Sequence, residues 1–599
     1  MGIIEVKDFW WKYQSYAGQE NPFALKGLNF EVDREEFLGI IGPSGAGKTT
    51  LCYALTGVIP HVFRPPSGKE ADCLKGEIRA FGQTMTKVEK VKDERSGVEE
   101  DKIVGMAQTA PRIGLVLQDP ENQFLRMDLL HEVAFGMELL GLPPNEIEGR
   151  AKEALEMVGL GSFWPVADLV HPSELSGGQK QRAAIASFLA IRPEVLVLDE
   201  PTSDLDPDGK LSVIRTIDSI RKDYRLTVVL VEHNPEVIQR YADRVLAIDK
   251  GATVAYGSME EVYSQMKLFA DHGLYSSDVA RIGYYGDAPY RNRVPFTVDE
   301  MMSSLEGREL KRIPLEEEGV ASAEEVMAVE GLNFWYDDGT HALKDVSFTL
   351  KKGEFIGLIG QNGAGKTTIS RIVAGIYKRY KGTVRVLGQD ISDRRVLQKI
   401  PEYVGYVFQN PDHQIFMRRV YDEVAYGLRN LKVPPSEVDK RVKEALQDVG
   451  LEGKMNEDPM FLGKGEKRRL TVASILAMKP GVMIVDEPTT GQDYRMSEDI
   501  MELLEKLNRE GTTIVAITHD MTLVSEHTKR VVVMYQGGVI FDGPTRTFFS
   551  NEELLDKAGI VAPLAVRLSR AYVTKHRDAP FMINAGEWIQ AIHGKSAPY

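Results

Sequence analysis

The sequence predicts an α/β fold in which two similar domains follow one another, each built around a largely parallel sheet. The first observation is a repeat: two glycine-rich motifs, ending at Thr49 and Thr367, lie 318 residues apart, and the motifs after them keep nearly the same spacing. The second is an alternation of strand-like apolar runs, such as 195–198, with helix-like stretches, such as 146–158. This alternation is typical of parallel sheets covered by helices, so the repeat indicates duplication of a whole domain.

The repeat sets the domain boundaries that we expect. The first domain should occupy about residues 1–265, a linker with some docked helix about 266–325, and the second domain about 326–560. The tail, 561–599, has an apolar pattern of its own, and we expect it to pack against a domain or a second chain.

The first copy is longer than the second in one place. Lys48 and Gln118 are 70 residues apart, whereas Lys366 and Gln409 are 43 apart. The extra residues form an insertion at about 62–109, a stretch dense in Lys, Glu, Asp and Gly. We expect a solvated excursion from the surface.

Each glycine-rich motif fits the P-loop pattern G-x-x-x-x-G-K-[ST], between a strand-like run and a helix-like run. The glycines let backbone N–H groups surround phosphate oxygens, the lysine reaches the β- and γ-phosphates, and the threonine hydroxyl holds Mg²⁺. The pattern therefore predicts two nucleoside triphosphate sites. Their residues are Gly42, Pro43, Ser44, Gly45, Ala46, Gly47, Lys48, Thr49 and Thr50 in the first copy, and Gly360, Gln361, Asn362, Gly363, Ala364, Gly365, Lys366, Thr367 and Thr368 in the second.

An apolar strand in each copy ends in two acids, Asp199-Glu200 and Asp486-Glu487. Near a P-loop the aspartate suits Mg²⁺, directly or through water. The glutamate is placed to polarise the water that attacks the γ-phosphate. The alternative, an acid pair that merely ends a strand, is the weaker interpretation beside two P-loops.

Four further polar residues occupy matched places in the two copies. His233 and His519 follow the next strand, and their position favours a contact with the γ-phosphate. Gln118 and Gln409 each stand at the end of a strand-like run, where a glutamine can ligate Mg²⁺ or orient water.

The first copy also contains Ser176, Gly177, Gly178 and Gln179 at the start of a helix-like run. A serine and two glycines there offer backbone N–H groups and a hydroxyl to an anion. Many loops share such a short pattern, but its place between a P-loop and an Asp-Glu strand makes it specific.

This order of motifs, together with 203–206 as an aspartate loop, resembles that of ATP-binding-cassette (ABC) ATPases over nearly the whole chain. The resemblance implies two cassettes, each with a parallel sheet core and a helical signature subdomain. It implies ATP and Mg²⁺ as ligands and ATP hydrolysis. It also implies head-to-tail pairing of the cassettes, with each ATP between one P-loop and the other signature. The resemblance further implies an aromatic side chain stacked on adenine. Matching Val6 with Val329 gives this role to Tyr13 and Tyr336, with Trp11 and Trp335 as nearby alternatives.

The segments after the two glutamines carry a narrower resemblance. Residues 118–124 with 131–136, and 409–416 with 421–427, are similar to the ATPases of energy-coupling-factor (ECF) importers for vitamins and transition metals. That family implies a transmembrane T component and a substrate-binding S component as partners. It also implies a peripheral position on the cytoplasmic face of the cell membrane.

The second signature departs from the pattern, since it reads Leu462-Gly463-Lys464-Gly465-Glu466. The serine hydroxyl is lost, a glycine has become Lys464, and the glutamine has become an acid. By head-to-tail pairing this signature faces the Lys48 site, where Lys464 and Gly465 would contact ATP, so the two sites should be unequal. Alternatively, the Lys464 ammonium replaces the lost hydrogen bond.

Composition limits the other classes of function. A formal net charge of −15 argues against nucleic-acid binding. The two cysteines suit a reducing compartment, the first residues do not predict a signal peptide, and no apolar run reaches the roughly 18–20 residues that span a bilayer. A membrane role therefore needs a partner. The alternatives are a twin-cassette ATPase acting on ribosomes or nucleic acid, and a fused sugar-importer ATPase.

Overall fold

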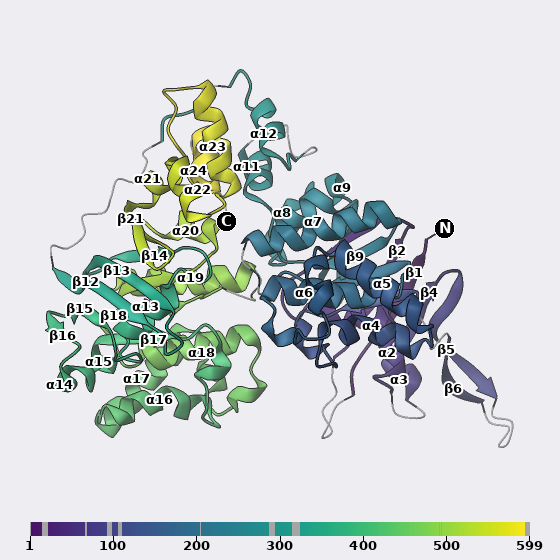
Figure 1. The fold of residues 1–599 in the computed structure, drawn as a ribbon, viewed down its shortest axis with the longest axis horizontal. Helices are drawn as coiled ribbons and strands as arrows, with labels where there is room; N and C mark the ends of the chain where they lie inside the picture. The colour runs from purple at the N-terminus through teal and green to yellow at the C-terminus, as the bar shows by residue number, and fades with distance from the viewer. Residues whose placement is uncertain are drawn as a thin grey trace. The chain divides into compact units, whose positions relative to one another are not determined.

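The chain divides into two compact units, shown in the computed structural model of Figure 1. The first unit comprises Met1–Ala280 and Pro289–Phe296, and the second comprises Arg281–Ala288 and Thr297–Tyr599. The structure describes residues 2–14, 22–65, 69–92, 99–105, 111–203, 205, 207–286, 294–308, 310–313, 324–489, 492 and 494–593.

A largely parallel sheet forms the centre of the first unit, as the sequence predicts. Its strand order is β11-β10-β3-β9-β8-β7, and every neighbouring pair is parallel except β10 with β11. The central strands are buried along their whole length, which explains their uninterrupted apolar sequences. The strands are β3 (Phe37–Ile41), β7 (Ile113–Val116), β8 (Val195–Asp199), β9 (Thr227–Val231), β10 (Arg244–Asp249) and β11 (Ala252–Ser258).

A second, antiparallel sheet of this unit has the order β2-β1-β4-β5-β6. A buried core joins side chains of both sheets with those of the helix that follows the P-loop, so the P-loop is fixed to a rigid base. The strands are β1 (Ile4–Trp11), β2 (Leu25–Val32), β4 (Leu74–Ala80), β5 (Gln83–Lys92) and β6 (Glu99–Val104).

The expectation that 62–109 is a solvated excursion is wrong for its middle part. Strand β4 pairs with β1, and Leu74, Ile78 and Met85 are buried. An antiparallel strand can bury one face and expose charge on the other, so a high charge content does not exclude a strand. The residues by which the first copy is longer than the second include the paired strands β5 and β6. Residues 66–68, 93–98 and 106–110 lie outside the described residues.

Among the helices of the first unit, α1 packs against the parallel sheet. The helices α4, α5 and α6 pack against one another and form a group of their own. This group corresponds to the helical signature subdomain that the resemblance to ABC ATPases implies. The helices are α1 (Lys48–Leu55), α2 (Val58–His61), α3 (Glu70–Cys73), α4 (Leu129–Leu139), α5 (Pro144–Met157), α6 (Gly177–Leu189), α7 (Pro207–Tyr224), α8 (Pro235–Tyr241), α9 (Met259–Tyr263) and α10 (Met266–Asp271).

The second unit repeats this plan. Its sheets have the orders β17-β18-β19-β14-β20-β21 and β13-β12-β15-β16. The strands are β12 (Glu325–Trp335), β13 (His341–Lys351), β14 (Phe355–Ile359), β15 (Lys381–Val386), β16 (Gln389–Asp390), β17 (Val404–Val407), β18 (Val482–Asp486), β19 (Thr513–Ile517), β20 (Arg530–Tyr535) and β21 (Gly538–Pro544). The helices are α13 (Lys366–Val373), α14 (Arg394–Leu397), α15 (Ile400–Tyr403), α16 (Val420–Asn430), α17 (Pro435–Asp448), α18 (Lys464–Leu476), α19 (Tyr494–Arg509), α20 (Met521–His527), α21 (Thr545–Ser550) and α22 (Glu552–Ala558).

Two tail helices, α23 (Leu564–Lys575) and α24 (Ala585–His593), pack within the second unit. The buried indole of Trp588 donates a hydrogen bond to the Ala565 carbonyl at 3.0 Å. In the sequence between the two copies are α11 (Asp278–Gly286) and α12 (Val298–Ser304), and α12 lies beside α23 (Figure 1). The acidic run at 314–319 lies outside the described residues.

None of the helices among these residues has both the length and the apolar character that a membrane span requires.

Candidate functional site

The two P-loops have the same geometry. Gly45 and Gly47 have φ angles of 78° and 100°, and Gly363 and Gly365 have 79° and 101°. This left-handed region strains other residues, which explains glycine at these four positions. The turn brings α1 and α13 to begin directly at the P-loop lysine.

Each P-loop lysine folds back onto its own loop. Lys48 Nζ donates to the carbonyls of Gly42 (2.9 Å) and Pro43 (3.2 Å). Lys366 Nζ donates to the carbonyls of Gly360 (2.6 Å) and Gln361 (2.9 Å). Both ammonium groups are therefore held over the cradle that backbone N–H groups offer to phosphate.

The acid at the end of β8 and β18 fits a magnesium ion in both units. Asp199 accepts a hydrogen bond from Thr49, and Asp486 accepts from Tyr406 Oη (2.6 Å) and from Thr367. The Oδ1 atom of each aspartate is buried and has no hydrogen-bond partner among the described residues. Burial raises the pKa of both carboxyl groups. An orphaned carboxylate oxygen beside a threonine hydroxyl suits a hard divalent cation, directly or through water.

The glutamate that follows each aspartate meets the predicted histidine. His233 Nε2 lies 2.8 Å from Glu200 Oε1, and His519 Nδ1 lies 2.9 Å from Glu487 Oε2. Both glutamates have left-handed backbone angles, with φ of 49° and 48°. Such strained residues often occur where a catalytic side chain must be aimed. The matched arrangement can hold and polarise a water molecule beside a phosphate.

The remaining predicted residues of the P-loop side lie in comparable places. The hydroxyl of Tyr13 lies 3.3 Å from Thr50 Oγ1, and that of Tyr336 lies 2.7 Å from Thr368 Oγ1. Both aromatic rings are thus beside the P-loop helix.

The two predicted glutamines differ in their surroundings. Gln118 donates to Ser203 Oγ at 3.3 Å, whereas Gln409 is exposed at the end of the strand. Asp204 and Asp206 of the predicted aspartate loop lie outside the described residues.

The two signatures start their helices differently. Ser176 caps α6: its hydroxyl accepts from the Gln179 N–H at 3.4 Å, and the Gln179 side chain accepts from the Ser176 N–H at 2.8 Å. Gly463 caps α18 without a side chain, and Glu466 accepts from the Gly463 N–H at 3.1 Å. Only half of the reciprocal cap therefore survives in the second unit.

The acid in the second signature is neutralised locally. Lys454 Nζ lies 2.7 Å from Glu466 Oε1. Burial opposes the charge, but this lysine and the Gly463 N–H hold the pKa of Glu466 below its usual value.

Comparison with known proteins identifies the family of the chain. The ABC transporter family model matches residues 25–203 and 343–490. A relative from Caldanaerobacter subterraneus, provisionally named an ABC transporter ATP-binding protein, is 38% identical over 94% of this chain and 95% of its own length. A relative from Methanosarcina mazei with the same kind of name is 35% identical over 94% of this chain and 93% of its own length. The chain belongs to the ABC transporter family.

Solved structures that resemble the chain cover one cassette each. CbiO1 of Clostridium perfringens, part of the ABC transporter complex CbiONQ, is 36% identical over 43% of this chain and all of its own, with a TM-score of 0.37. The dimeric bacterial ABC cassette MJ0796 is 28% identical over 37% of this chain and 98% of its own, with a TM-score of 0.34.

The protein is thus an ABC ATPase with two tandem cassettes, and it binds ATP with Mg²⁺. The ion supplies charge stabilisation to the transferred phosphoryl group when it is bound. In each cassette the P-loop threonine and the aspartate that ends β8 or β18, Asp199 or Asp486, are the residues whose geometry suits the ion.

Sequence reasoning missed a buried acid that shapes the loop after each glutamine. Glu132 of α4 accepts from the N–H groups of Leu125 and Arg126, both at 2.8 Å. Glu423 of α16 accepts from those of Phe416 (3.0 Å) and Met417 (2.8 Å). The matched glutamates lie inside segments that the sequence analysis quoted, but only the fold shows that they bind the loop.

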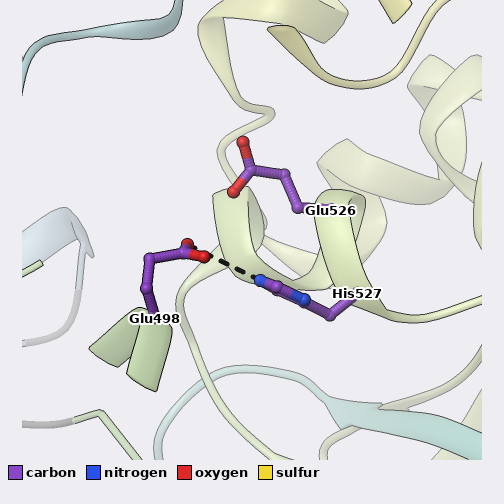
Figure 2. A group of neighbouring side chains, drawn as sticks. All are labelled: Glu498, Glu526 and His527. Carbon is purple, nitrogen blue, oxygen red and sulfur yellow. Dashed lines mark ion pairs between the residues drawn. The ribbon is translucent and has the colours of Figure 1, made fainter. Parts of the chain in front are cut away.

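A second group of ionisable side chains in the second cassette brings together Glu498, Glu526 and His527 (Figure 2). His527 lies 3.6 Å from Glu498 and 2.8 Å from Glu505, and Arg281 of α11 lies 3.1 Å from Glu526. Although burial opposes protonation, the glutamates raise the pKa of His527 to about 10. A proton on the His527 ring and the charge of Arg281 offset much of the negative charge of the carboxylates, so we interpret this group as an ionic network rather than a metal site.

Proposed function

We propose that this ABC ATPase is the energy-coupling subunit of an ECF-type importer for a vitamin or a transition-metal micronutrient. In this proposal it lies on the cytoplasmic face of the cell membrane, beneath a transmembrane T component and a substrate-binding S component. ATP binding and hydrolysis by the paired cassettes would drive the conformational change of these partners.

The observation that carries the proposal is a pair of exposed apolar loops, one in each cassette. Leu125 and Met127 are 68% and 76% exposed, and Phe416 is 60% exposed at the matching place. Each loop follows the predicted Gln residue and is held by the buried glutamate of α4 or α16. Exposed apolar side chains on a fixed loop suit an amphipathic helix of a partner.

The acids of these loops form ion pairs within their own cassettes. Glu121 forms an ion pair with Lys180, and Asp412 forms one with Lys467 at 2.8 Å. Both lysines belong to the helix that carries the signature. Charge reversal of either acid would break this contact within the cassette, so the apolar residues make a cleaner test of docking.

The proposal includes two unequal ATP sites. By head-to-tail pairing the Lys48 site would face Gly463, Lys464 and Gly465, where the serine hydroxyl is missing. The Lys366 site would face Ser176 and Gly178, whose helix start retains the full reciprocal cap. Hydrolysis would then come mainly from the Lys366 site.

Docking is tested by co-expressing the chain with a multi-span T component of an ECF transporter and measuring the fraction of the chain that floats with membranes. Leu125→Asp and Phe416→Asp should each lower this fraction, because losing one buried apolar side chain costs about 1.5–3 kcal/mol, which is about tenfold or more in affinity. Leu139→Asp is the matched control, since Leu139 is equally exposed but lies at the far end of α4.

Membrane association that survives both loop substitutions would remove the docking surface. Co-sedimentation with ribosomes, with no membrane protein bound, would favour the twin-cassette class that acts on ribosomes or nucleic acid.

A further inference from the structure

The second cassette buries an arginine beside its catalytic acid. Arg468 lies in α18, and only 1% of its side chain is exposed. Its Nη1 group donates to the Phe408 carbonyl at 2.5 Å, and its Nη2 group donates to the Glu487 carbonyl at 2.6 Å. The guanidinium therefore joins the signature helix to two loops at once.

Both acceptors lie at places where backbone direction decides the position of a functional side chain. Phe408 directly precedes Gln409, and Glu487 is the strained residue whose φ is 48°. Hydrogen bonds from a charged donor are roughly twice as strong as neutral ones. A planar guanidinium also fixes the relative direction of its two acceptors, which a single ammonium cannot do.

No such brace occurs among the described residues of the first cassette. Its matching residue is Gln181, which is also buried. The Gln181 Nε2 atom has no hydrogen-bond partner in the part of the chain that the structure describes. Glu200 has the same strained backbone angle as Glu487, so the strain is shared and the arginine is specific to one cassette.

We infer that Arg468 is a positioning residue for hydrolysis at the Lys366 site: it holds the Glu487 backbone and the start of the Gln409 loop in one arrangement with α18. This inference rests on the proposed role of Glu487. Any shift of the signature helix would then be transmitted to the acid and to the glutamine together.

The test is steady-state ATPase kinetics of the full chain carrying Arg468→Gln, the side chain of the first cassette. We expect kcat to fall about 10- to 100-fold, as for a displaced catalytic group, with the KM for ATP changed less than about threefold. Arg468→Lys should give an intermediate kcat, because one ammonium replaces only part of the bridge.

The matched control is Arg469→Gln on the same helix. Arg469 donates to the Val449 carbonyl within the helical subdomain, at 3.1 Å, and this variant should keep the parental kcat. Thermal unfolding and nucleotide binding verify that each variant is folded. If Arg468→Gln does not fold, the test uses Arg468→Lys instead. A parental kcat in Arg468→Lys would overturn the inference.

The same substitution in a Glu200→Gln background separates this inference from the proposed function. An unchanged kcat after Arg468→Gln, in the parent and in that background, would overturn the role of Arg468 and leave the site assignment intact. Loss of all turnover in Glu200→Gln alone, with Arg468→Gln still lowering kcat of the parent, would instead refute the unequal sites.

Discussion

At the scale of single residues, the two nucleotide sites are nearly identical on the P-loop side. The lysine contacts, the orphaned aspartate oxygen and the glutamate–histidine pair occur in both cassettes. The cassettes differ at the signature, where a serine cap in one is replaced in the other by a glycine and a Lys454–Glu466 ion pair. The unequal activity that we propose would therefore come from the signature that each cassette presents to the other.

This difference predicts unequal effects of removing the two glutamates. Glu487→Gln should bind ATP but lose most turnover, because loss of a positioned general base costs about 10²–10⁴-fold. Glu200→Gln should retain substantial turnover. The measurement is ATP hydrolysis by both variants in one assembled complex. Equal losses would mean that Lys464 compensates or that the sites are tightly coupled, and a larger loss from Glu200→Gln would refute the assignment.

At the scale of elements, the ionic network around His527 connects α11, α19 and α20. Along the chain, α19 follows the strand that ends in Asp486, and α20 follows the strand that precedes the predicted site residue His519. A contact between them and the segment that joins the cassettes gives that segment a fixed attachment within the second unit.

Because the network contains a histidine with a raised pKa, we expect the free energy of unfolding of the second unit to fall as the pH rises from 6.5 to 10. The folded pKa of His527, about 10, is above its usual 6.5, so the stabilisation is complete below pH 6.5 and disappears as pH rises through 10. The free energy of opening should fall by about 1.4 kcal/mol per pH unit at most over that range. Hydrogen exchange of α20 measures it, and His527→Gln should abolish the dependence. An unchanged pH profile in that variant would show that other groups titrate.

Local patterns predict elements well, and long-range contacts poorly. The strands at 195–199 and 513–517 were predictable because buried parallel strands are continuous apolar runs. The strands β4 and β5 were missed because alternating charge also describes a solvated loop. The sequence gives no signal that Arg468 reaches Phe408 and Glu487, 60 and 19 residues away, since that contact exists only once the sheet and the helical subdomain have formed.

At the scale of the whole molecule, the chain combines two ATP-binding cassettes with exposed apolar loops that suit another polypeptide. We expect the purified chain alone to hydrolyse ATP slowly and to catalyse no transport. Binding of the membrane partner should raise kcat about tenfold or more, which requires only about 1.4 kcal/mol of additional transition-state stabilisation. ATPase assays with and without the partner in lipid vesicles measure this effect. A full rate without the partner would contradict the proposed coupling.

The placement of the two thiols has a practical consequence. Cys52 and Cys73 are free, buried and both in the first unit, and the second unit has no cysteine. Cys52 lies on α1 one turn after Lys48, and burial raises its pKa well above the usual value. Because the thiolate is the reactive form, a thiol reagent modifies Cys52 only after local unfolding of α1 exposes the side chain. Cys52 is thus a native chemical reporter for the first P-loop. Its labelling rate should fall when ATP occupies the Lys48 site and should not change when ATP occupies the Lys366 site.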